Sequence, residues 1–394
     1  MVVFSYYPAD PRPRREAEAL VDAGMAVDLI CLRNEGELSH EVVNGVGVYR
    51  LPIQRKRAGK VRYLWEYALF ILLAFFKLSA LHLRRRYDVA HVHNMPDVLV
   101  FSALLPRLTG AKVILDLHDP MPEVYMTKYD IGADHPVIRT LRLFEKWSIA
   151  FSHLVLTPNI AFCDLFAARS CESSKVHVIM NSPDLRIFGG RSHAPSSAAA
   201  GAQFVVMFHG TIVERHGLDT ALEAAAKLRN AIPELRFEVY GEGDFVERFQ
   251  EIVRELKLED IVHYHGRVSL EKIASAIPSI NVGLVPNKRS VFTDINLPTR
   301  LFEYLCMGKP VIAPKTKGIL DYFTEDALPY FDAGDVDSLA AVIQDLHDHP
   351  DRVKSYLERG TAIYEAHRWD VQREELIALV AALAVGPKMS SGPQ

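Results

Sequence analysis

Residues 294–313, DINLPTRLFEYLCMGKPVIA, predict a short helix that runs directly into a buried strand. Pro298 suits the first position of the helix, and Gly308 is typical of its end. The leucines of the helix share one face, while Glu303 falls on the opposite face. Two interpretations of this carboxylate are open: a solvated partner of Arg300 one turn earlier, or a group of a functional site.

Strand-like runs of this kind recur along the whole chain and alternate with helical patterns. They cover residues 2–7, 26–32, 45–51, 88–94, 112–119 and 153–159, and then 204–210, 235–244, 261–268, 280–287 and 309–314. Short apolar, β-branched runs separated by helices are typical of parallel sheets covered on both faces. The sequence therefore predicts an α/β fold.

The two series of strands are separated by residues 186–203, which are rich in Gly, Ser, Ala and Pro and predict a linker. The simplest interpretation is two doubly wound domains, residues 1–185 and 204–365. Ligands of open α/β sheets bind at the carboxyl ends of the strands. We therefore expect the functional site in a cleft between the two domains.

The composition is that of a soluble globular protein. The chain has 394 residues, of which 49% are hydrophobic and 24% charged, and its net charge of −4 gives no general reason to bind nucleic acid. Its four cysteines form no CxxC pair, which argues against a zinc ribbon and a disulfide framework. A reducing, cytoplasmic location is expected.

Seven segments resemble family-4 glycosyltransferases of the GT-B fold in sequence, order and spacing, over essentially the whole chain. They are YYPADPRPRREAEALVDAGMAVDLICLR (6–33), YDVAHVHN (87–94), KVILDLHDPMPE (112–123), HGTIVERHGLDTALEA (209–224), VYGEGD (239–244), HGRVSLEKIASAIPSINVGLVP (265–286) and LPTRLFEYLCMGKPVIA (297–313). The resemblance implies two Rossmann-like domains that face each other across a cleft, with the acceptor bound by the first and a nucleotide sugar by the second. Residues 366–394 would form a helix that crosses back to the first domain, followed by a disordered tail.

The resemblance gives Glu303 a role, because the family's glutamate at this place binds the ribose hydroxyls of the donor. A carboxylate can accept from two neighbouring hydroxyls at once. The amides at the start of the helix lack helical partners and suit a diphosphate. The donor-binding residues expected from the resemblance are Gly210, Thr211, Arg215, Gly241, Val268, Lys288, Leu297, Pro298, Thr299, Arg300 and Glu303, and Glu303 is also expected to be catalytic.

The sequence departs from the family pattern at three positions. Many members carry a second glutamate eight positions before Glu303, where this chain has Ile295. In the same members an Arg and a Lys follow the first strand of the second domain, at the positions that Thr211 and His216 occupy in this chain. A diphosphate needs a fixed cation, so Arg215 is the first candidate here. Arg300 or Lys288 would supplement it.

On the first domain, His118 follows a strand, and alternation sends Asp116 and His118 to one face. The family carries a catalytic histidine in an equivalent loop, so the resemblance implies that His118 lies near the transferred sugar. Asp119 and Glu123 in the same segment are candidates for acceptor binding.

The resemblance implies a retaining, metal-independent transfer of a sugar from a nucleotide diphosphate sugar to a glycan or lipid-linked acceptor, without a cofactor, in bacterial cell-surface polysaccharide synthesis. Two alternatives are open. A metal-dependent hydrolase could use His91, His93 and Asp97, since two histidines two apart on a strand can ligate zinc together. A non-catalytic GT-B protein that binds a nucleotide sugar or a partner is favoured by Ile295.

Residues 55–86 contain ten uncharged residues, 67–76, between basic clusters. This run is shorter than the roughly 20 apolar residues that span a bilayer. It is typical either of a buried core helix or of an interfacial helix whose basic residues meet anionic lipid. The second interpretation predicts peripheral contact with the inner face of the cell membrane.

Overall fold

The chain forms two compact units. Unit 1 comprises residues Met1–Met180 and Asp370–Gln394, and unit 2 comprises Asn181–Trp369. The computed structural model describes residues 1–54, 60–189 and 203–385. Residues 190–202 of the predicted linker and 386–394 of the predicted tail lie outside the described residues, and so do the basic residues 55–57 and the side chains of 60–64.

Unit 1 is built on an eight-stranded sheet in the order β3-β4-β2-β1-β5-β6-β7-β8. Its strands are β1 (Val2–Tyr6), β2 (Asp28–Leu32), β3 (His40–Val43), β4 (Val46–Leu51), β5 (Val89–His93), β6 (Lys112–Asp116), β7 (Leu154–Thr157) and β8 (Val176–Val178). Every pair of neighbours is parallel except β3 and β4. The predicted α/β class is confirmed.

Strand β3 is an addition that the pattern of apolar runs did not predict. Its residues alternate between exposed and half-buried, so it has no continuous apolar run. It pairs with β4 through a tight turn in which Asn44 and Gly45 have φ values of 52° and 81°. Positive φ at both positions is the geometry of an Asn-Gly hairpin.

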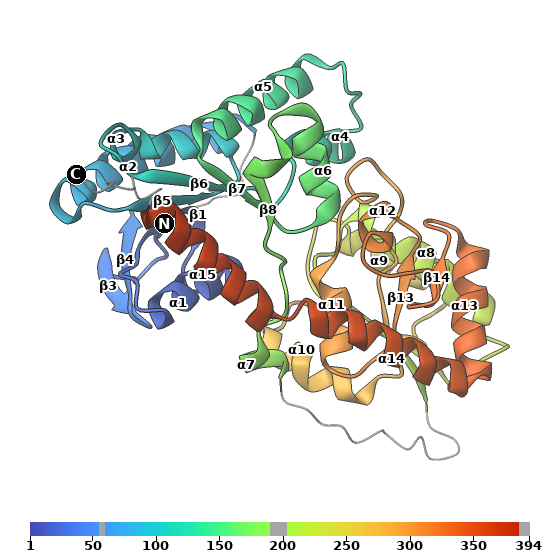
Figure 1. The fold of residues 1–394 in the computed structure, drawn as a ribbon. Helices are drawn as coiled ribbons and strands as arrows, with labels where there is room; N and C mark the ends of the chain where they lie inside the picture. Colours follow the sequence, from blue (N-terminus) through green and yellow to red (C-terminus); the bar gives the residue numbers. More distant parts are fainter. Residues whose placement is uncertain (55–59, 190–202, 386–394) are drawn as a thin grey trace. The chain divides into compact units, whose positions relative to one another are not determined.

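Helices cover both faces of the sheet of unit 1. Figure 1 shows α2 (Lys60–Arg85), α3 (Leu104–Leu108) and α5 (Pro136–Phe151) on one face, and α1 (Pro11–Asp22) and α15 (Trp369–Val385) on the other. The remaining elements are η1 (Asp97–Ala103), α4 (Met121–Tyr129), α6 (Ile160–Arg169) and η2 (Ser173–Lys175).

Helix α2 has two different faces. Tyr67, Phe70 and Ala74 are buried against the sheet, and Phe4 of β1 contacts both aromatic rings. By length and composition alone, Trp65–Arg85 could cross a membrane, and 44% of its most apolar window is buried inside the protein. The opposite face carries exposed large side chains: Trp65, Leu69, Leu72, Phe76 and Leu83. The helix is therefore a core helix on one side only.

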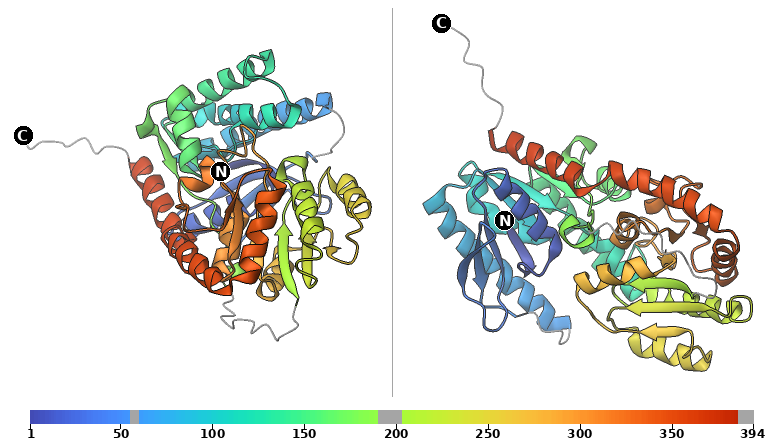
Figure 2. Two further views of the ribbon diagram at one scale, coloured as in Figure 1. Left: turned by 90° about the vertical axis from the view of Figure 1, so that its right-hand side faces the viewer. Right: turned by 90° about the horizontal axis from the view of Figure 1, so that it is seen from below.

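Unit 2 is built on a six-stranded sheet in the order β11-β10-β9-β12-β13-β14, and all its strand pairs are parallel. The strands are β9 (Phe204–His209), β10 (Leu235–Tyr240), β11 (Val262–Tyr264), β12 (Val282–Leu284), β13 (Val311–Pro314) and β14 (Tyr330–Phe331). The buried residues of the central strands form one apolar core with the inward faces of neighbouring helices. Figure 2 shows the sheet of unit 2 from two further sides.

Several of the loops of unit 2 contain a short helix. The helical elements of this unit are α7 (Leu185–Phe188), η3 (Glu214–His216), α8 (Leu218–Leu228), α9 (Val246–Glu255), α10 (Leu270–Ala276), η4 (Ile277–Ser279), α11 (Thr299–Cys306), α12 (Lys317–Leu320), α13 (Val336–Asp348) and α14 (Pro350–Ala366). Helix α11 begins at Thr299, one residue later than predicted, because Pro298 is extended, with ψ of 125°, and takes the N-cap position. Leu301 and Leu305 are buried as predicted.

Candidate functional sites

In unit 2, the end of β9 meets the start of α11 at Gly210 and Arg300. Gly210 has φ of 130°, and a Cβ atom there would lie 3.2 Å from Cζ of Arg300. The guanidinium stacks on Phe208, with Cζ 4.6 Å from the ring centroid, and its Nη2 lies 3.4 Å from Nδ1 of His216. The φ of 130° favours glycine, and a Cβ atom here would press on the guanidinium.

Arg300 is an incompletely satisfied cation. Its Nη1 is buried and donates no hydrogen bond to the described residues. Burial lowers the pKa of the guanidinium, although an arginine remains charged at neutral pH. A buried N–H without an acceptor is costly, whereas a phosphate oxygen would complete its hydrogen bonds. The geometry therefore suits an anion.

Glu303 lies one turn further along α11. Its side chain is 13% exposed, and its Oε2 lies 3.3 Å from Nε2 of His209, the last residue of β9. Burial, with a contribution from Arg300, lowers the pKa of His209 to about 3, so this imidazole is neutral at neutral pH. The interpretation of Glu303 as a solvated group is wrong, because the carboxylate faces the end of the strand, but its electrostatic interaction with Arg300 is present.

The three candidate cations differ in their surroundings. Nζ of Lys288 forms an ion pair with Asp219. Arg215 lies over the ring of Phe292, with Cζ 5.9 Å from the centroid, and its carbonyl oxygen accepts from the amide of Lys288 at 3.1 Å. Arg300, which the sequence ranked behind Arg215, is the cation next to Gly210.

The other predicted donor residues lie in loops around this point. Gly241 has φ of 145°, and a Cβ atom there would lie 1.8 Å from the carbonyl oxygen of Gly210, so the two turns pack directly on each other. Thr211 follows Gly210 and is exposed, and Val268 is half-buried after β11. At the start of α11, Leu297 and Thr299 are half-buried and Pro298 is buried.

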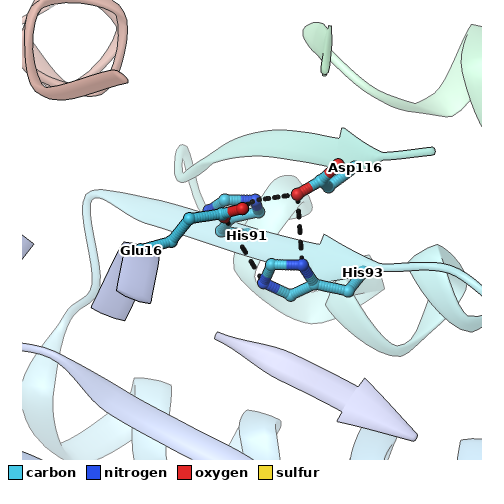
Figure 3. Close-up of side chains that lie close together, drawn as sticks. All are labelled: Glu16, His91, His93 and Asp116. Carbon is cyan, nitrogen blue, oxygen red and sulfur yellow. Dashed lines mark ion pairs between the residues drawn. The ribbon is translucent and has the colours of Figure 1, made fainter. Parts of the chain in front are cut away.

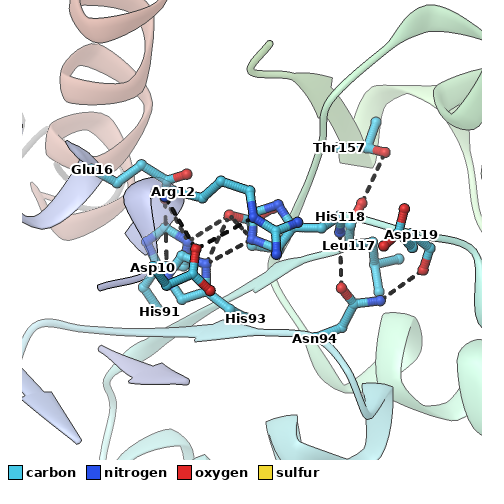
Figure 4. Close-up of polar contacts among 11 residues, drawn as sticks. Asp10, Arg12, Glu16, His91, His93, Asn94, Leu117, His118, Asp119 and Thr157 are labelled. Carbon is cyan, nitrogen blue, oxygen red and sulfur yellow. Dashed lines mark hydrogen bonds and ion pairs between the residues drawn. The ribbon is translucent and has the colours of Figure 1, made fainter. Parts of the chain in front are cut away.

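In unit 1, His118 is almost fully buried after β6. Its amide donates to Oδ1 of Asn94 at 2.9 Å, and its Nε2 lies 3.0 Å from Nδ1 of His93 and 3.4 Å from Oδ2 of Asp116 (Figure 4). The prediction that Asp116 and His118 share one face is confirmed. Burial lowers the pKa of His118 to about 3, so the ring is neutral at neutral pH.

Asn94 joins the two loops that follow β5 and β6. Its Nδ2 donates to Oδ1 of Asp97 at 3.0 Å and to the carbonyl oxygen of Asp119 at 2.8 Å. Burial raises the pKa of Asp97 to about 7. Asp97 therefore supports Asn94 instead of joining His91 and His93, as the hydrolase alternative required.

Glu123 is part of a buried ion network. Its two carboxylate oxygens accept from Arg169 at 2.6 and 2.9 Å, and Arg169 also donates to Glu145. This arrangement ties α4 to α5 and α6 and occupies the carboxylate that was a candidate for acceptor binding. Asp119, the other candidate, is half-buried and interacts electrostatically with Arg12.

His91 and His93 instead meet Glu16 of α1 and Asp116 of β6 (Figure 3). Asp116 carried a signal in the sequence, because it lies at the end of a predicted strand, and the register of β5 and β6 in the structure sets it beside His93. Glu16 had no such signal, since its place depends on how α1 packs on the sheet. Asp10 caps α1, accepting from the amide of Arg12 at 3.2 Å, and so helps to set that helix.

The chain can now be assigned to a family. Residues 9–182 match the model of a glycosyl transferase 4-like domain, and residues 191–362 match that of glycosyl transferases group 1. The chain belongs to the group 1 glycosyltransferases, with a glycosyl transferase 4-like first domain and the two Rossmann-like domains of the GT-B fold.

Curated relatives and solved structures agree with this assignment. WcaL of Escherichia coli (strain K12), assigned as a colanic acid biosynthesis glycosyltransferase, is 25% identical over 168 residues, which are 41% of this chain and 40% of WcaL. Sucrose-phosphate synthase of Thermosynechococcus elongatus has a TM-score of 0.78 at 18% identity, over 96% of this chain and 98% of that one. Anabaena HepE in complex with UDP-glucose has a TM-score of 0.71 at 13% identity, over 96% and 98%.

Proposed function

We propose that the protein is a glycosyltransferase that moves a sugar, with retention of configuration, from a nucleotide diphosphate sugar to the hydroxyl of a glycan or lipid-linked acceptor. The observation that carries the proposal is Arg300, whose buried Nη1 has no hydrogen-bond acceptor in the described chain beside Gly210. The family assignment and the UDP-glucose bound by HepE support the class of donor.

In this proposal, unit 2 binds the donor. Arg300 and the first amides of α11 hold the diphosphate, and Glu303 accepts from the ribose hydroxyls. As the glycosidic bond breaks, negative charge develops on the leaving diphosphate. A fixed guanidinium and helix amides stabilise that charge more in the transition state than in the ground state. Transfer then needs no metal at the diphosphate and no other cofactor.

Unit 1 supplies His118 and binds the acceptor. The neutral imidazole can bond a hydroxyl of the transferred sugar and orient the donor. Asp119 is retained as an acceptor-binding residue, because its neighbour Asn94 fixes its backbone at 2.8 Å. Glu123 is left out of the acceptor site, because Arg169 holds both its oxygens.

We place the reaction on the cytoplasmic face of the cell membrane, in the synthesis of cell-surface polysaccharide. WcaL is assigned to colanic acid synthesis, which supports this context. The exposed apolar face of α2 is followed by the exposed Arg84 and Arg86, while Arg85 between them forms an ion pair with Asp28. An apolar face beside basic residues suits anionic lipid.

The test is a thermal-shift and calorimetric screen with UDP, GDP, ADP and TDP and their common sugars, with and without EDTA. A ligand that binds only the folded state raises the melting temperature. We expect one nucleotide to bind whether or not EDTA is present. Glu303→Gln should weaken that binding, whereas His118→Ala should leave it intact and lower turnover.

Three outcomes separate the alternatives. Binding followed by transfer to an acceptor supports the proposal. Binding without hydrolysis or transfer under any acceptor tested would favour a non-catalytic nucleotide-sugar-binding protein. Failure of every nucleotide to bind would remove the donor site around Arg300.

A further inference from the structure

Unit 1 contains a compact cluster of four side chains with metal-binding chemistry, outside the donor site. Glu16 comes from α1, His91 and His93 from β5, and Asp116 from the end of β6. One ligand atom from each lies within 4.8 Å of the others, and all four residues are buried. Figure 3 shows the carboxylates and imidazoles converging from these three elements.

The cluster leaves several polar atoms without hydrogen bonds. Both ring nitrogens of His91, Nε2 of His93, Oε2 of Glu16 and Oδ2 of Asp116 are buried and have no hydrogen-bond partner in the part of the chain that the structure describes. Buried polar atoms are normally satisfied, because each unsatisfied atom costs about 1–3 kcal/mol. The groups also contact one another, with Oδ2 of Asp116 3.1 Å from Nδ1 of His93, and a partner that accepts electron pairs from oxygen and nitrogen together would satisfy the remaining atoms.

The distances between the ligand atoms are somewhat longer than those around a shared ion. Nε2 of His91 lies 3.6 Å from Oε2 of Glu16 and 3.5 Å from Oδ2 of Asp116, and Nε2 of His93 lies 3.9 Å from the same Glu16 oxygen. In a tetrahedral zinc site with bonds of about 2.0–2.1 Å, ligand atoms are about 3.4 Å apart. Small shifts of these side chains would complete such a site.

We propose that Glu16, His91, His93 and Asp116 bind one divalent transition-metal ion, with Zn²⁺ as the best match. Two imidazoles and two carboxylates favour Zn²⁺ over Mg²⁺ or Ca²⁺, which prefer ligand sets made of oxygen alone. Four protein ligands in a buried position make a closed site, which is typical of a structural ion. The four ligands belong to unit 1, whereas the proposed function assigns the diphosphate to unit 2, so this inference leaves the metal-free donor site unchanged.

The ion would also position His118, and this part rests on the proposed function. If Nε2 of His93 binds the metal, its Nδ1 carries the proton, and this N–H lies between Nε2 of His118 at 3.0 Å and Oδ2 of Asp116 at 3.1 Å; with that oxygen on the metal, His118 is the acceptor. Second-shell hydrogen bonds of this kind fix the tautomer and the ring orientation of the neighbour. Because Nε2 of His118 accepts this hydrogen bond, the proton of its neutral ring lies on Nδ1.

The test uses the full chain without a histidine tag, stripped of metal with a chelator and then dialysed. Titration with Co²⁺ should give one bound ion per chain and the intense visible absorption of a tetrahedral site, and Zn²⁺ should abolish that absorption. Zn²⁺ should also raise the melting temperature. If the chain binds neither Co²⁺ nor Zn²⁺ at one ion per chain, the proposal is overturned. The four side chains would then be explained by protons shared between them.

His91→Ala should lose the cobalt absorption, whereas the matched variant His177→Ala, at a half-exposed histidine of β8, should keep it. If His91→Ala binds Co²⁺ as tightly as the native protein, the proposed ligand set is wrong. If His91→Ala does not fold, the titration of the native protein still decides. Metal content and absorption do not depend on transfer, so failure of the proposed function would leave this result intact.

Discussion

Arg300 shows how a single side chain can define a ligand site. Two neighbours hold its guanidinium in place, the ring of Phe208 beneath it and the glycine beside it, while Nδ1 of His216 at 3.4 Å donates to the carbonyl oxygen of Thr211 and offers no acceptor. None of these neighbours offers a negative charge. The fork of N–H groups is therefore organised before any ligand arrives, which lowers the entropy lost on binding.

Arg300→Lys tests this organisation. Lysine keeps the charge but loses the planar fork, so one charge-assisted hydrogen bond worth about 1.5–3 kcal/mol should be lost. The dissociation constant of the preferred nucleotide diphosphate should then rise by roughly 10-fold to 100-fold in calorimetry. Arg229→Lys, at an exposed ion pair with Asp260, is the matched control and should bind like the native protein. Equal affinities in the two variants would contradict the assignment.

His209 makes acid stability a second test at the residue scale. Its pKa is about 3 in the folded state and 6.5 in the unfolded state, so the unfolded state takes up the proton first as the pH falls. Stability from this group is therefore complete above pH 6.5 and is lost as the pH falls toward 3, by about 2 kcal/mol between pH 7 and pH 5.

His209→Asn removes the titrating group, so the urea midpoint of the variant should fall less between pH 7 and pH 5 than that of the native protein. Circular dichroism at pH 7, 6 and 5 gives both midpoints. Identical pH dependence in the two proteins would show that His209 is as readily protonated when folded as when unfolded.

Much of the candidate site could be predicted from the sequence at this scale, for physical reasons. His118 and Asp116 could be paired because alternation along a strand fixes which side chains share a face. Glu16 could not be found, since its approach to His91 depends on the packing of a helix against a sheet. The sequence could not rank Arg300 first among the candidate cations. That rank depends on the burial of Arg300 and on the ion pair that Lys288 forms with Asp219, and neither can be predicted from a linear pattern.

At the scale of elements, α2 has one buried face and one exposed apolar face. Its inward face packs on the sheet, and its outward face presents Trp65, Leu69, Leu72 and Phe76 at intervals of three or four residues. The sequence predicted a helix but left open whether it is a core helix or an interfacial one. The inward face is that of a core helix, and the exposed apolar face leaves the interfacial interpretation as a prediction, since a 26-residue helix is long enough to carry both patterns.

Phe76→Asp tests the outward face. Phe76 is 60% exposed, so the change should leave folding intact while removing an apolar group worth about 1.5–3 kcal/mol when buried in lipid. Binding to vesicles that contain anionic lipid should weaken by roughly 10-fold or more in a sedimentation assay. Leu38→Asp changes an exposed leucine outside α2 and should bind vesicles like the native protein. No difference between the two variants would count against a membrane role of α2.

At the scale of the whole molecule, unit 2 is one continuous stretch, Asn181–Trp369, whereas unit 1 is assembled from two stretches. Helix α15 belongs to unit 1: Oε1 of Gln372 accepts from the amide of Met180 at 2.7 Å, and Leu376 is buried. The two Rossmann-like folds followed from the alternating pattern of the sequence. The exact point at which the chain changes units did not, because it depends on contacts between residues almost two hundred positions apart.

This organisation predicts that residues 181–369, expressed alone, fold and bind the nucleotide with the affinity of the full chain, because Arg300, Glu303 and the core of unit 2 all lie within that stretch. They should transfer no sugar, since His118 is absent. Residues 1–180 expressed alone lack α15 and should unfold at a lower temperature than the same residues mixed with a peptide of residues 366–385. Calorimetry and circular dichroism measure both effects, and a segment 181–369 that folds without binding nucleotide would contradict the first.

The return of α15 to unit 1 also has a consequence for how the protein is made. During translation the ribosome releases the whole of unit 2 before the residues that complete unit 1 exist. For that period Met180 and the surface that later holds Leu376 have no native partner, so the nascent first domain must wait with an uncovered apolar face while the second domain is synthesised. The helix that completes the first domain thus emerges only after the second domain, and chaperones have their longest opportunity to act on the N-terminal half.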